Sequence, residues 1–504
     1  MINYETLINQ AAGLIIPEII LLATVCVMLL AAPFMVSETG VAPSGLRHRW
    51  GILVLLALSV ATLTWFRTSP STESVTSGPF RSDEFVWFIR GISLAAGFLL
   101  TLILWDQIDD AHAAEAHACL LAILCGVNFT AISNDLVTLF LGLELVSIPT
   151  YISLILPRRD WNASEATIKY FLLSIFSSAI VLYGFSWIYG LAGTTSLPAI
   201  AERMAAGASG AHRGMYLLAL VFVTLGISFR LTAVPFHFYA PDVFQGITPP
   251  SAAMLSFIPK VVGFSALLRL LPFCAGNVGG LTDWTPEGPL KAILTVIAVL
   301  TMLTGNLLAI RQSNILRMMA YSSIAHAGYM LVGLTMGDTP GSTSGIASLL
   351  FYLSVYGVMT VGVFALLTAA SSVRKPIRTL SELAGLSRTR PAAAFMMSVC
   401  LFGLSGLPPT GGFLGKLNLF FSAWSSGSQH GKILAAVLAV NAVIAASYYL
   451  RLIAAMYLEP SSGEDTRSEA QPAAFVAGMV CASATLAIFA LPQWLWDAAL
   501  HAAG

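Results

Sequence analysis

The chain has 504 residues, of which 57% are hydrophobic and only 10% charged, and its formal net charge is zero. Soluble domains carry about 25% charged residues, so this composition excludes a soluble fold and predicts an all-α polytopic membrane protein. The neutral balance argues against nucleic acid as a partner, and no two of the six cysteines have the spacing of a zinc or iron–sulfur site.

Fourteen apolar stretches are long enough to cross about 30 Å of hydrocarbon. They lie at 11–35, 50–66, 85–104, 113–131, 135–156, 165–190, 215–238, 244–271, 290–309, 316–336, 346–370, 391–425, 432–456 and 472–495. The first stretch follows an N-terminus without Lys or Arg, so it is predicted to be a retained span and not a secretory signal.

The loop charges predict an orientation by the positive-inside rule. With the N-terminus outside, the cytoplasmic loops and helix ends hold most of the basic residues: Arg47, Arg49, Arg158, Arg159, Arg311, Arg317, Arg374, Lys375, Arg378, Arg388, Arg390, Arg451 and Arg467. The opposite side holds Arg67, Arg81, Arg203, Arg213, Lys291 and Lys432. Both termini are therefore predicted to lie on the periplasmic side, which agrees with an even number of spans.

Two spans contain helix-breaking residues near their middles, "FRLTAVPFHFYAPDVFQGITPP" (229–250) and "LSGLPPTGGFLGKLNLF" (404–420). They are the seventh and the twelfth span, and each is the fourth in a group of five. Broken helices in corresponding positions of two halves indicate a repeat-built transporter, and an odd number of spans inverts the second copy. The predicted units are three N-terminal helices (1–110), a first five-helix repeat (111–272), a second, inverted repeat (290–457) and a C-terminal helix (471–504).

Ionisable residues at membrane depth usually face a bundle interior or a wet cavity. A single such residue can be explained by snorkelling to the membrane surface or by the pinning of a helix. Several of them along one chain are harder to explain in that way. We single out seven such residues: Glu144, Lys169, Arg230, His237, Lys260, His326 and Lys416.

The residue types in this row suit proton transfer. A lysine in a low dielectric gives up its proton more readily than in water, and an approaching carboxylate such as Glu144 restores the charged form. Histidine titrates near neutral pH, and unwound backbone can hold water between the titrating groups. Other interpretations stay open: His237 and His326 as hydrogen-bonded core histidines, and Arg230 as a charge that ties down the broken helix.

Several segments resemble the antiporter-like membrane subunits of respiratory complex I, over nearly the whole chain. They are "LFLGLELVSIPTY", "EATIKYFLLS", "VPFHFYAPDVFQG", "NILRMMAYSSIAH", "LSGLPPTGGFLGK" and "YYLRLIAAMYL". The resemblance implies fourteen helices, with two inverted repeats and broken seventh and twelfth helices. It also implies that Glu144 is the acidic residue of the fifth helix, and that Lys169, Lys260 and Lys416 are the lysines of the sixth, eighth and twelfth. Arg230 stands where the family has a lysine, which is a departure from its pattern.

The function implied by this resemblance is proton translocation coupled to NADH oxidation and quinone reduction. No cofactor is expected in this chain, because NADH, FMN, the iron–sulfur clusters and quinone belong to partner subunits. The expected partners are other membrane subunits, including neighbouring antiporter-like ones, in a bacterial inner membrane. The alternative is a subunit of a multisubunit sodium/proton antiporter, whereas the titratable row argues against a purely structural scaffold.

Overall fold

The structure is a computed structural model, which describes residues 12–36, 42–68, 75–158, 160–207, 211–277, 281, 284–338, 343–372, 377–460 and 471–504. Arg159, Arg374, Lys375 and Arg467, which the orientation prediction uses, lie outside these residues, as do the side chain of Arg213 and the first eleven residues of the predicted N-terminal unit.

Helices make up nearly all of the described chain. Those before the first break are α2 (Ile16–Met35), α3 (Leu46–Arg67), α4 (Glu84–Leu104), the 3-10 turn η1 (Asp110–His112), α5 (Ala113–Ile132), α6 (Leu136–Ile155), α7 (Trp161–Ala192), α8 (Leu197–Gly207) and α9 (Ala211–Leu231). Those between the breaks are α10 (Ala240–Gly246), α11 (Pro249–Cys274), α12 (Gly288–Ile310), α13 (Ile315–Met336), α14 (Gly345–Ala370), α15 (Leu380–Leu383), α16 (Leu386–Thr389) and α17 (Pro391–Ser405). The last are α18 (Gly411–Ser425), α19 (Gln429–Leu458), α20 (Pro472–Ala490) and α21 (Gln493–Ala503).

Twelve of the described helices are long and apolar enough to span a membrane by length and composition. The predicted all-helical, polytopic fold is thereby confirmed, whereas the number of fourteen spans and the four unit boundaries stay predictions. One antiparallel hairpin, β1 (Val75–Ser77) with β2 (Phe80–Ser82), joins α3 to α4.

Both predicted helix breaks are confirmed. The first separates α9 from α10, and Thr232 at its start has a φ of 56°, a left-handed conformation that a helix cannot continue through. The second separates α17 from α18, where Gly406 ends the helix with a φ of 82° and Pro408 and Pro409 follow. Each break interrupts a helix inside the membrane-spanning part of the chain.

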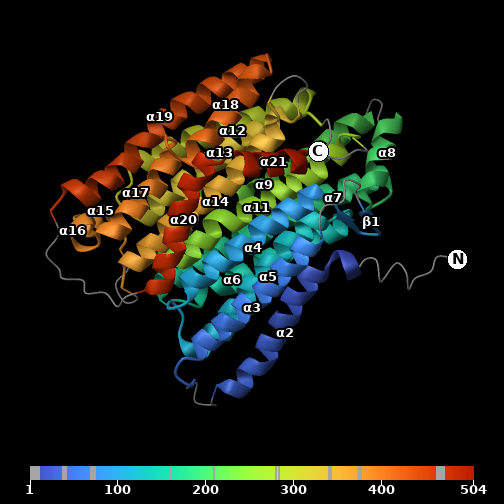
Figure 1. Cartoon of the computed structure of the whole chain (residues 1–504). Coiled ribbons are helices and arrows are strands. Elements are labelled where there is room, and N and C mark those ends of the chain that lie inside the picture. Colours follow the sequence, from blue (N-terminus) through green and yellow to red (C-terminus); the bar gives the residue numbers. More distant parts are fainter. Residues whose placement is uncertain are drawn as a thin grey trace.

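The helices run side by side, with α2 and α3 at one end of the molecule and α18 and α19 at the other (Figure 1). In between, α11 is buried along its whole apolar window, while only 33% of the window of α7 is buried. α11 packs against α9, α13 and α14, and α14 packs against α18. The most buried helices therefore connect the two breaks.

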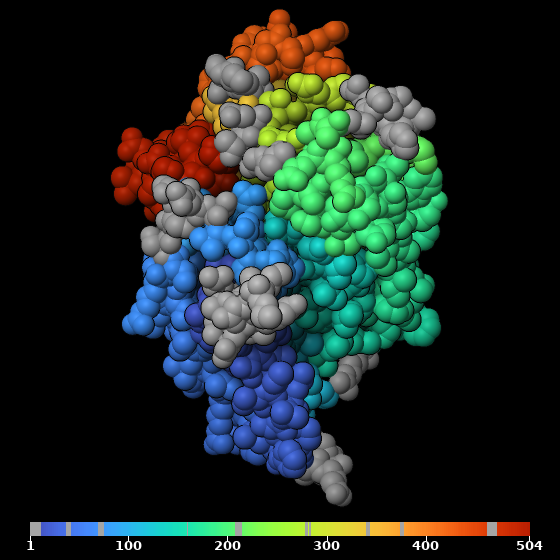
Figure 2. Space-filling model, turned by 90° about the vertical axis from the view of Figure 1, so that its right-hand side faces the viewer, coloured from blue at the N-terminus to red at the C-terminus, as the bar shows by residue number. Residues whose placement is uncertain are grey.

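The C-terminal stretch differs from the prediction of a single span over 472–495. α20 ends at Ala490, and α21 begins at Gln493 after Pro492, whose ring removes a backbone N–H from the helix ladder. α21 packs on α4 and α14 and lies across the neighbouring helices (Figure 1). Seen from the end that holds α8, α21 (red) and α8 (green) lie on opposite sides of the molecule (Figure 2).

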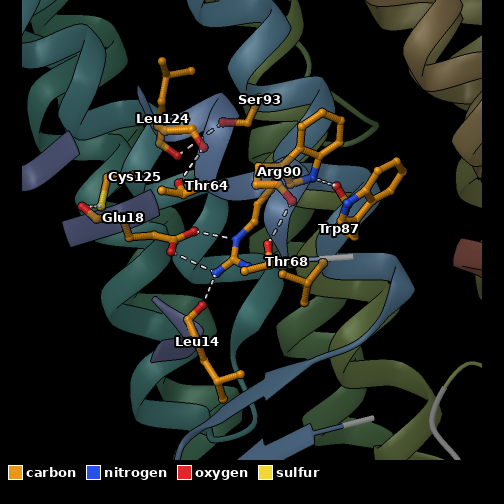
Figure 3. Close-up of polar contacts among 12 residues, drawn as sticks. Leu14, Glu18, Thr64, Thr68, Trp87, Arg90, Ser93, Leu124 and Cys125 are labelled. Carbon is orange, nitrogen blue, oxygen red and sulfur yellow. Dashed lines mark hydrogen bonds and ion pairs between the residues drawn. The ribbon is translucent and has the colours of Figure 1, made fainter. Parts of the chain in front are cut away.

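A buried ion pair joins α2 to α4 (Figure 3). Arg90 donates from Nε to Glu18 Oε1 at 2.7 Å, and from Nη2 to Glu18 Oε2 at 2.9 Å and to the carbonyl of Leu14 at 2.6 Å. The Glu18 side chain is fully buried and that of Arg90 is 3% exposed. The thiol of Cys125 on α5 approaches the Glu18 carbonyl at 3.8 Å, so α2, α4 and α5 meet at this pair.

Candidate functional site

The first part of the candidate site is an ion pair between α6 and α9. Arg230 Nη2 lies 3.3 Å from Glu144 Oε1, and Arg230 Nη1 donates to Ser147 Oγ at 2.8 Å. Ser178 on α7 donates to the same Glu144 oxygen at 2.6 Å. Arg230 is buried, while the Glu144 side chain is 24% exposed. Glu144 and Arg230 therefore form an ion pair between α6 and α9.

The second part is Lys260, at the centre of α11 and fully buried. Its Nζ donates to Ser323 Oγ on α13 at 2.5 Å, to the carbonyl of Ser256 at 3.2 Å and to Thr232 Oγ1 at 3.5 Å. Thr232 reaches Lys260 because the chain leaves α9 at this residue. All three acceptors are neutral, so within the described part of the chain no carboxylate accepts a hydrogen bond from this ammonium.

The third part is Lys416 on α18, which is 5% exposed. Its Nζ donates to the carbonyls of Leu404 at 2.7 Å and Ser405 at 3.0 Å. These carbonyls belong to the last turn of α17, whose acceptors have no partner within the helix because the chain breaks at Gly406. The ring of Tyr329 lies 5.0 Å from Nζ. Each break thus supplies neutral oxygen atoms to one buried lysine.

His326 lies on α13, in the space between the two lysines. Its Nδ1 is 2.7 Å from the hydroxyl of Tyr352 and its Nε2 is 3.0 Å from that of Tyr449. The ring of Tyr356 lies 4.9 Å from the imidazole, and its hydroxyl donates to Ser323 at 3.0 Å. His326 is fully buried.

Two predicted residues lie apart from this group. Lys169 is 42% exposed and pairs with Glu165 at 2.7 Å and with Asp242 at 3.6 Å. His237 is half-buried in the segment between α9 and α10, and among the described residues no hydrogen bond joins its ring to Arg230 or Lys260. The structure therefore brings five of the seven predicted residues into two groups: Glu144 with Arg230, and Lys260 with His326 and Lys416.

The sequence reasoning missed the neutral residues that hold these groups. Tyr352 and Tyr356 are four residues apart on one face of α14, a spacing that was visible in the sequence. A tyrosine inside an apolar helix usually finds a hydrogen-bond partner, and this signal points toward the site. A second buried network beside it joins Asn306 to Tyr329 at 2.9 Å and to Asn441 at 3.0 Å.

This arrangement can hold and pass protons within a membrane. It offers a carboxylate beside a guanidinium, two lysines among neutral oxygens, and an imidazole bonded at both nitrogens. Among the described residues, no group of three His, Cys, Asp or Glu side chains is placed to hold a metal ion.

Comparison with known proteins identifies the family. Residues 133–444 match the NADH:quinone oxidoreductase/Mrp antiporter transmembrane family. The chain is 38% identical to NADH-quinone oxidoreductase subunit N of Trichlorobacter lovleyi, over 90% of this chain and 88% of that protein. It is also 38% identical to NAD(P)H-quinone oxidoreductase subunit 2 of Thermosynechococcus vestitus, over 89% of this chain and 82% of that one.

Solved structures show the same relationship. A chain of respiratory complex I from Thermus thermophilus with bound aureothin superposes with a TM-score of 0.74 at 28% identity, covering 95% of this chain and 98% of that one. A chain of the Mrp complex from Dietzia sp. has the same fold, with a TM-score of 0.75 at 20% identity and 97% of each chain covered. This chain therefore belongs to the NADH:quinone oxidoreductase/Mrp antiporter transmembrane family.

Proposed function

We propose that this chain is a proton-translocating membrane subunit of an NADH:quinone oxidoreductase. Relatives at 38% identity are named as subunits of such enzymes and are matched over most of their length. In this proposal NADH oxidation and quinone reduction take place in partner subunits, which hold the flavin, the iron–sulfur clusters and the quinone. This chain carries protons across a bacterial inner membrane beside other antiporter-like subunits.

The observation that carries the proposal is the surrounding of Lys260. An ammonium buried among neutral groups is destabilised unless it is fully compensated, so its proton is easily exchanged when a nearby charge moves. Ser323, Ser256 and Thr232 supply only neutral oxygens. A lysine with a purely structural role would be better stabilised by a carboxylate partner.

The proposed route begins at Glu144 and Arg230 and continues through Lys260 and His326 to Lys416. Arg230 acts as a fixed positive charge, since a guanidinium keeps its proton. When Arg230 approaches Glu144, its positive charge favours the ionised carboxylate. When Arg230 withdraws, Glu144 takes up a proton, and the proton affinity of Lys260 changes because the charges near it have changed. Lys169 and His237 belong to the entry region of this route.

A sodium/proton antiporter subunit is the second candidate from the sequence. The names of the relatives above 30% identity favour the oxidoreductase, and the likeness to the Mrp complex, at 20% identity, concerns the fold alone. Purification of the native complex separates the two candidates. Flavin and iron–sulfur absorbance in the pure complex supports the oxidoreductase; proton exchange driven by a sodium gradient, without such absorbance, supports the antiporter.

Glu144→Gln tests the proposal in the assembled complex. The amide keeps the volume and an acceptor for Ser178 but removes the charge, so the complex is expected to assemble and to lose proton pumping and coupled quinone reduction. Glu287→Gln, an exposed carboxylate at the start of α12, serves as the control. Pumping at the unmodified level in Glu144→Gln vesicles would show that this carboxylate has no part in the route.

A further inference from the structure

The hydrogen bonds of His326 do not go to the lysines on either side. Both ring nitrogens are engaged by phenols, Nδ1 by Tyr352 at 2.7 Å and Nε2 by Tyr449 at 3.0 Å. Tyr352 comes from α14 and Tyr449 from α19, so two helices fix the imidazole from two directions. All three residues are fully buried, which excludes bulk water from these bonds.

A neutral imidazole carries one N–H and one lone pair, and a phenol has one donor hydrogen and two acceptor positions. One of the two tyrosines must therefore donate to the ring while the other accepts from it. The pair of hydroxyls decides which tautomer of the ring is favoured, and a rotation of both hydroxyls favours the other tautomer. Tyr449 also hydrogen-bonds Ser322, one turn before His326, which couples its hydroxyl to a further rotatable group.

The tyrosines of α14 divide the space between the lysines. Tyr356 lies on the Lys260 side, because its hydroxyl donates to Ser323, which also accepts from Lys260. Tyr352 lies on the Lys416 side, because its ring packs against Gly415, where any Cβ atom would overlap it. The imidazole of His326 lies between these rings, with centroids 4.9 Å from Tyr356 and 5.8 Å from Tyr352.

We propose that Tyr352 and Tyr449 are positioning residues, which set the orientation and tautomer of His326 for proton transfer from Lys260 toward Lys416. The inference rests on the proposed function. One proton arrives at one nitrogen of the imidazole while the proton on the other nitrogen leaves toward Lys416. The ring is neutral before and after and one proton has moved, but the remaining N–H is then on the opposite nitrogen. A flip of the imidazole about its Cβ–Cγ bond, followed by rotation of both hydroxyls, restores the original tautomer and its hydrogen bonds.

The test compares three single-atom deletions in the intact complex: Tyr352→Phe, Tyr449→Phe and Tyr216→Phe. Tyr216 is a matched control, because it is also a buried tyrosine and lies on α9 beside Cys274 at the end of α11, not beside His326. We expect the rate of proton pumping to fall by roughly tenfold in the first two variants, in the range of one lost hydrogen bond to the reacting group, and to stay near the unmodified rate in Tyr216→Phe. Complex content and uncoupled NADH oxidation are expected to stay unchanged in all three.

A double-mutant cycle distinguishes positioning from a structural role. If the tyrosines act through His326, then Tyr352→Phe adds no further loss of pumping to His326→Gln, whereas independent effects on stability would add. Additive losses, or a loss of pumping that follows a loss of complex content, would overturn the proposal.

Lys260→Ala separates this inference from the function on which it rests. If Lys260→Ala abolishes pumping while Tyr352→Phe and Tyr449→Phe pump at the unmodified rate, the inference is wrong and the proposed function stands. If Lys260→Ala itself pumps at the unmodified rate, the proposed function fails.

Discussion

Position 230 shows how much depends on one residue type. A lysine there could alternate between charged and neutral forms, while the guanidinium of Arg230 stays charged and offers five N–H donors in a rigid plane. The structure uses that geometry, since two different nitrogens of Arg230 engage Glu144 and Ser147 on α6. Its charge is therefore available to act on Glu144, although it is not available to carry a proton.

We expect Arg230→Lys to assemble and to pump nearly normally, because a charge within reach of Glu144 is kept. Arg230→Met should assemble but pump roughly tenfold more slowly, the effect of one lost charged hydrogen bond, because Glu144 then keeps only the neutral Ser178 as a partner. The measurement is proton pumping per complex in membrane vesicles, with complex content from native gels. Normal pumping in Arg230→Met would remove the charge from the mechanism, and failure to assemble would show that Arg230 anchors the broken helix.

At the residue scale, the sequence points to charges better than to their surroundings. Arg230, Lys260 and Lys416 stand out because ions are rare in apolar spans. Thr232, Ser323 and Tyr352 do not, because hydroxyl groups are common in such helices and their importance depends on what packs against them. Glu18 and Arg90 were also not among the predicted residues. One acidic and one basic residue in separate apolar stretches were nevertheless a signal in the sequence that the two could form a pair.

At the scale of elements, the breaks explain why the buried lysines lie where they do. Thr232 lies at the start of one break and the Leu404 and Ser405 carbonyls at the start of the other, and each set faces a lysine. Prolines and glycines made both breaks predictable from the sequence. α8 and the β1–β2 hairpin were not predicted because neither has the long apolar run by which spans are recognised.

The Glu18–Arg90 pair gives a prediction for the N-terminal helices. Removing one partner leaves an uncompensated buried charge, which costs about 3–5 kcal/mol, whereas replacing both with apolar residues is often neutral. Glu18→Ala is therefore expected to lower the thermal stability of the complex strongly and to loosen α2. The double variant Glu18→Leu with Arg90→Met is expected to recover most of that loss.

The measurement is the midpoint of thermal unfolding of the purified complex, with the rate of proteolytic cleavage within α2 as a local probe of that helix. Asp109→Ala, on the loop before η1, is a control that removes a carboxylate outside the pair. If the double variant were as unstable as Glu18→Ala, the ion pair itself would be required, and compensation between two buried charges would not explain its presence.

At the scale of the whole molecule, the charged residues gather at two ends of the helix bundle. Arg317 pairs with Asp242 at 2.6 Å, and Arg451 donates to the carbonyl of Ile310, so predicted cytoplasmic arginines lie together. α15 and α16 lie at that end, while α8, the hairpin and the C-terminus lie at the opposite one (Figure 1). This segregation agrees with a single membrane orientation, which the positive-inside rule predicts to be N-out and C-out.

Reporter fusions test that orientation. Alkaline phosphatase fused after Gly504 is expected to be active, because it folds only on the outer side, and green fluorescent protein at the same place is expected to stay dark. A fusion after Glu459, at the end of α19 that holds Arg451, should give the reverse result. If both fusions reported the opposite sides, the arginine-rich end would face outward against the charge bias. Glu144 and Lys416 would then keep their places in the proposed route. Protons, however, would have to move along it from Lys416 to Glu144, because movement in the other direction would oppose pumping.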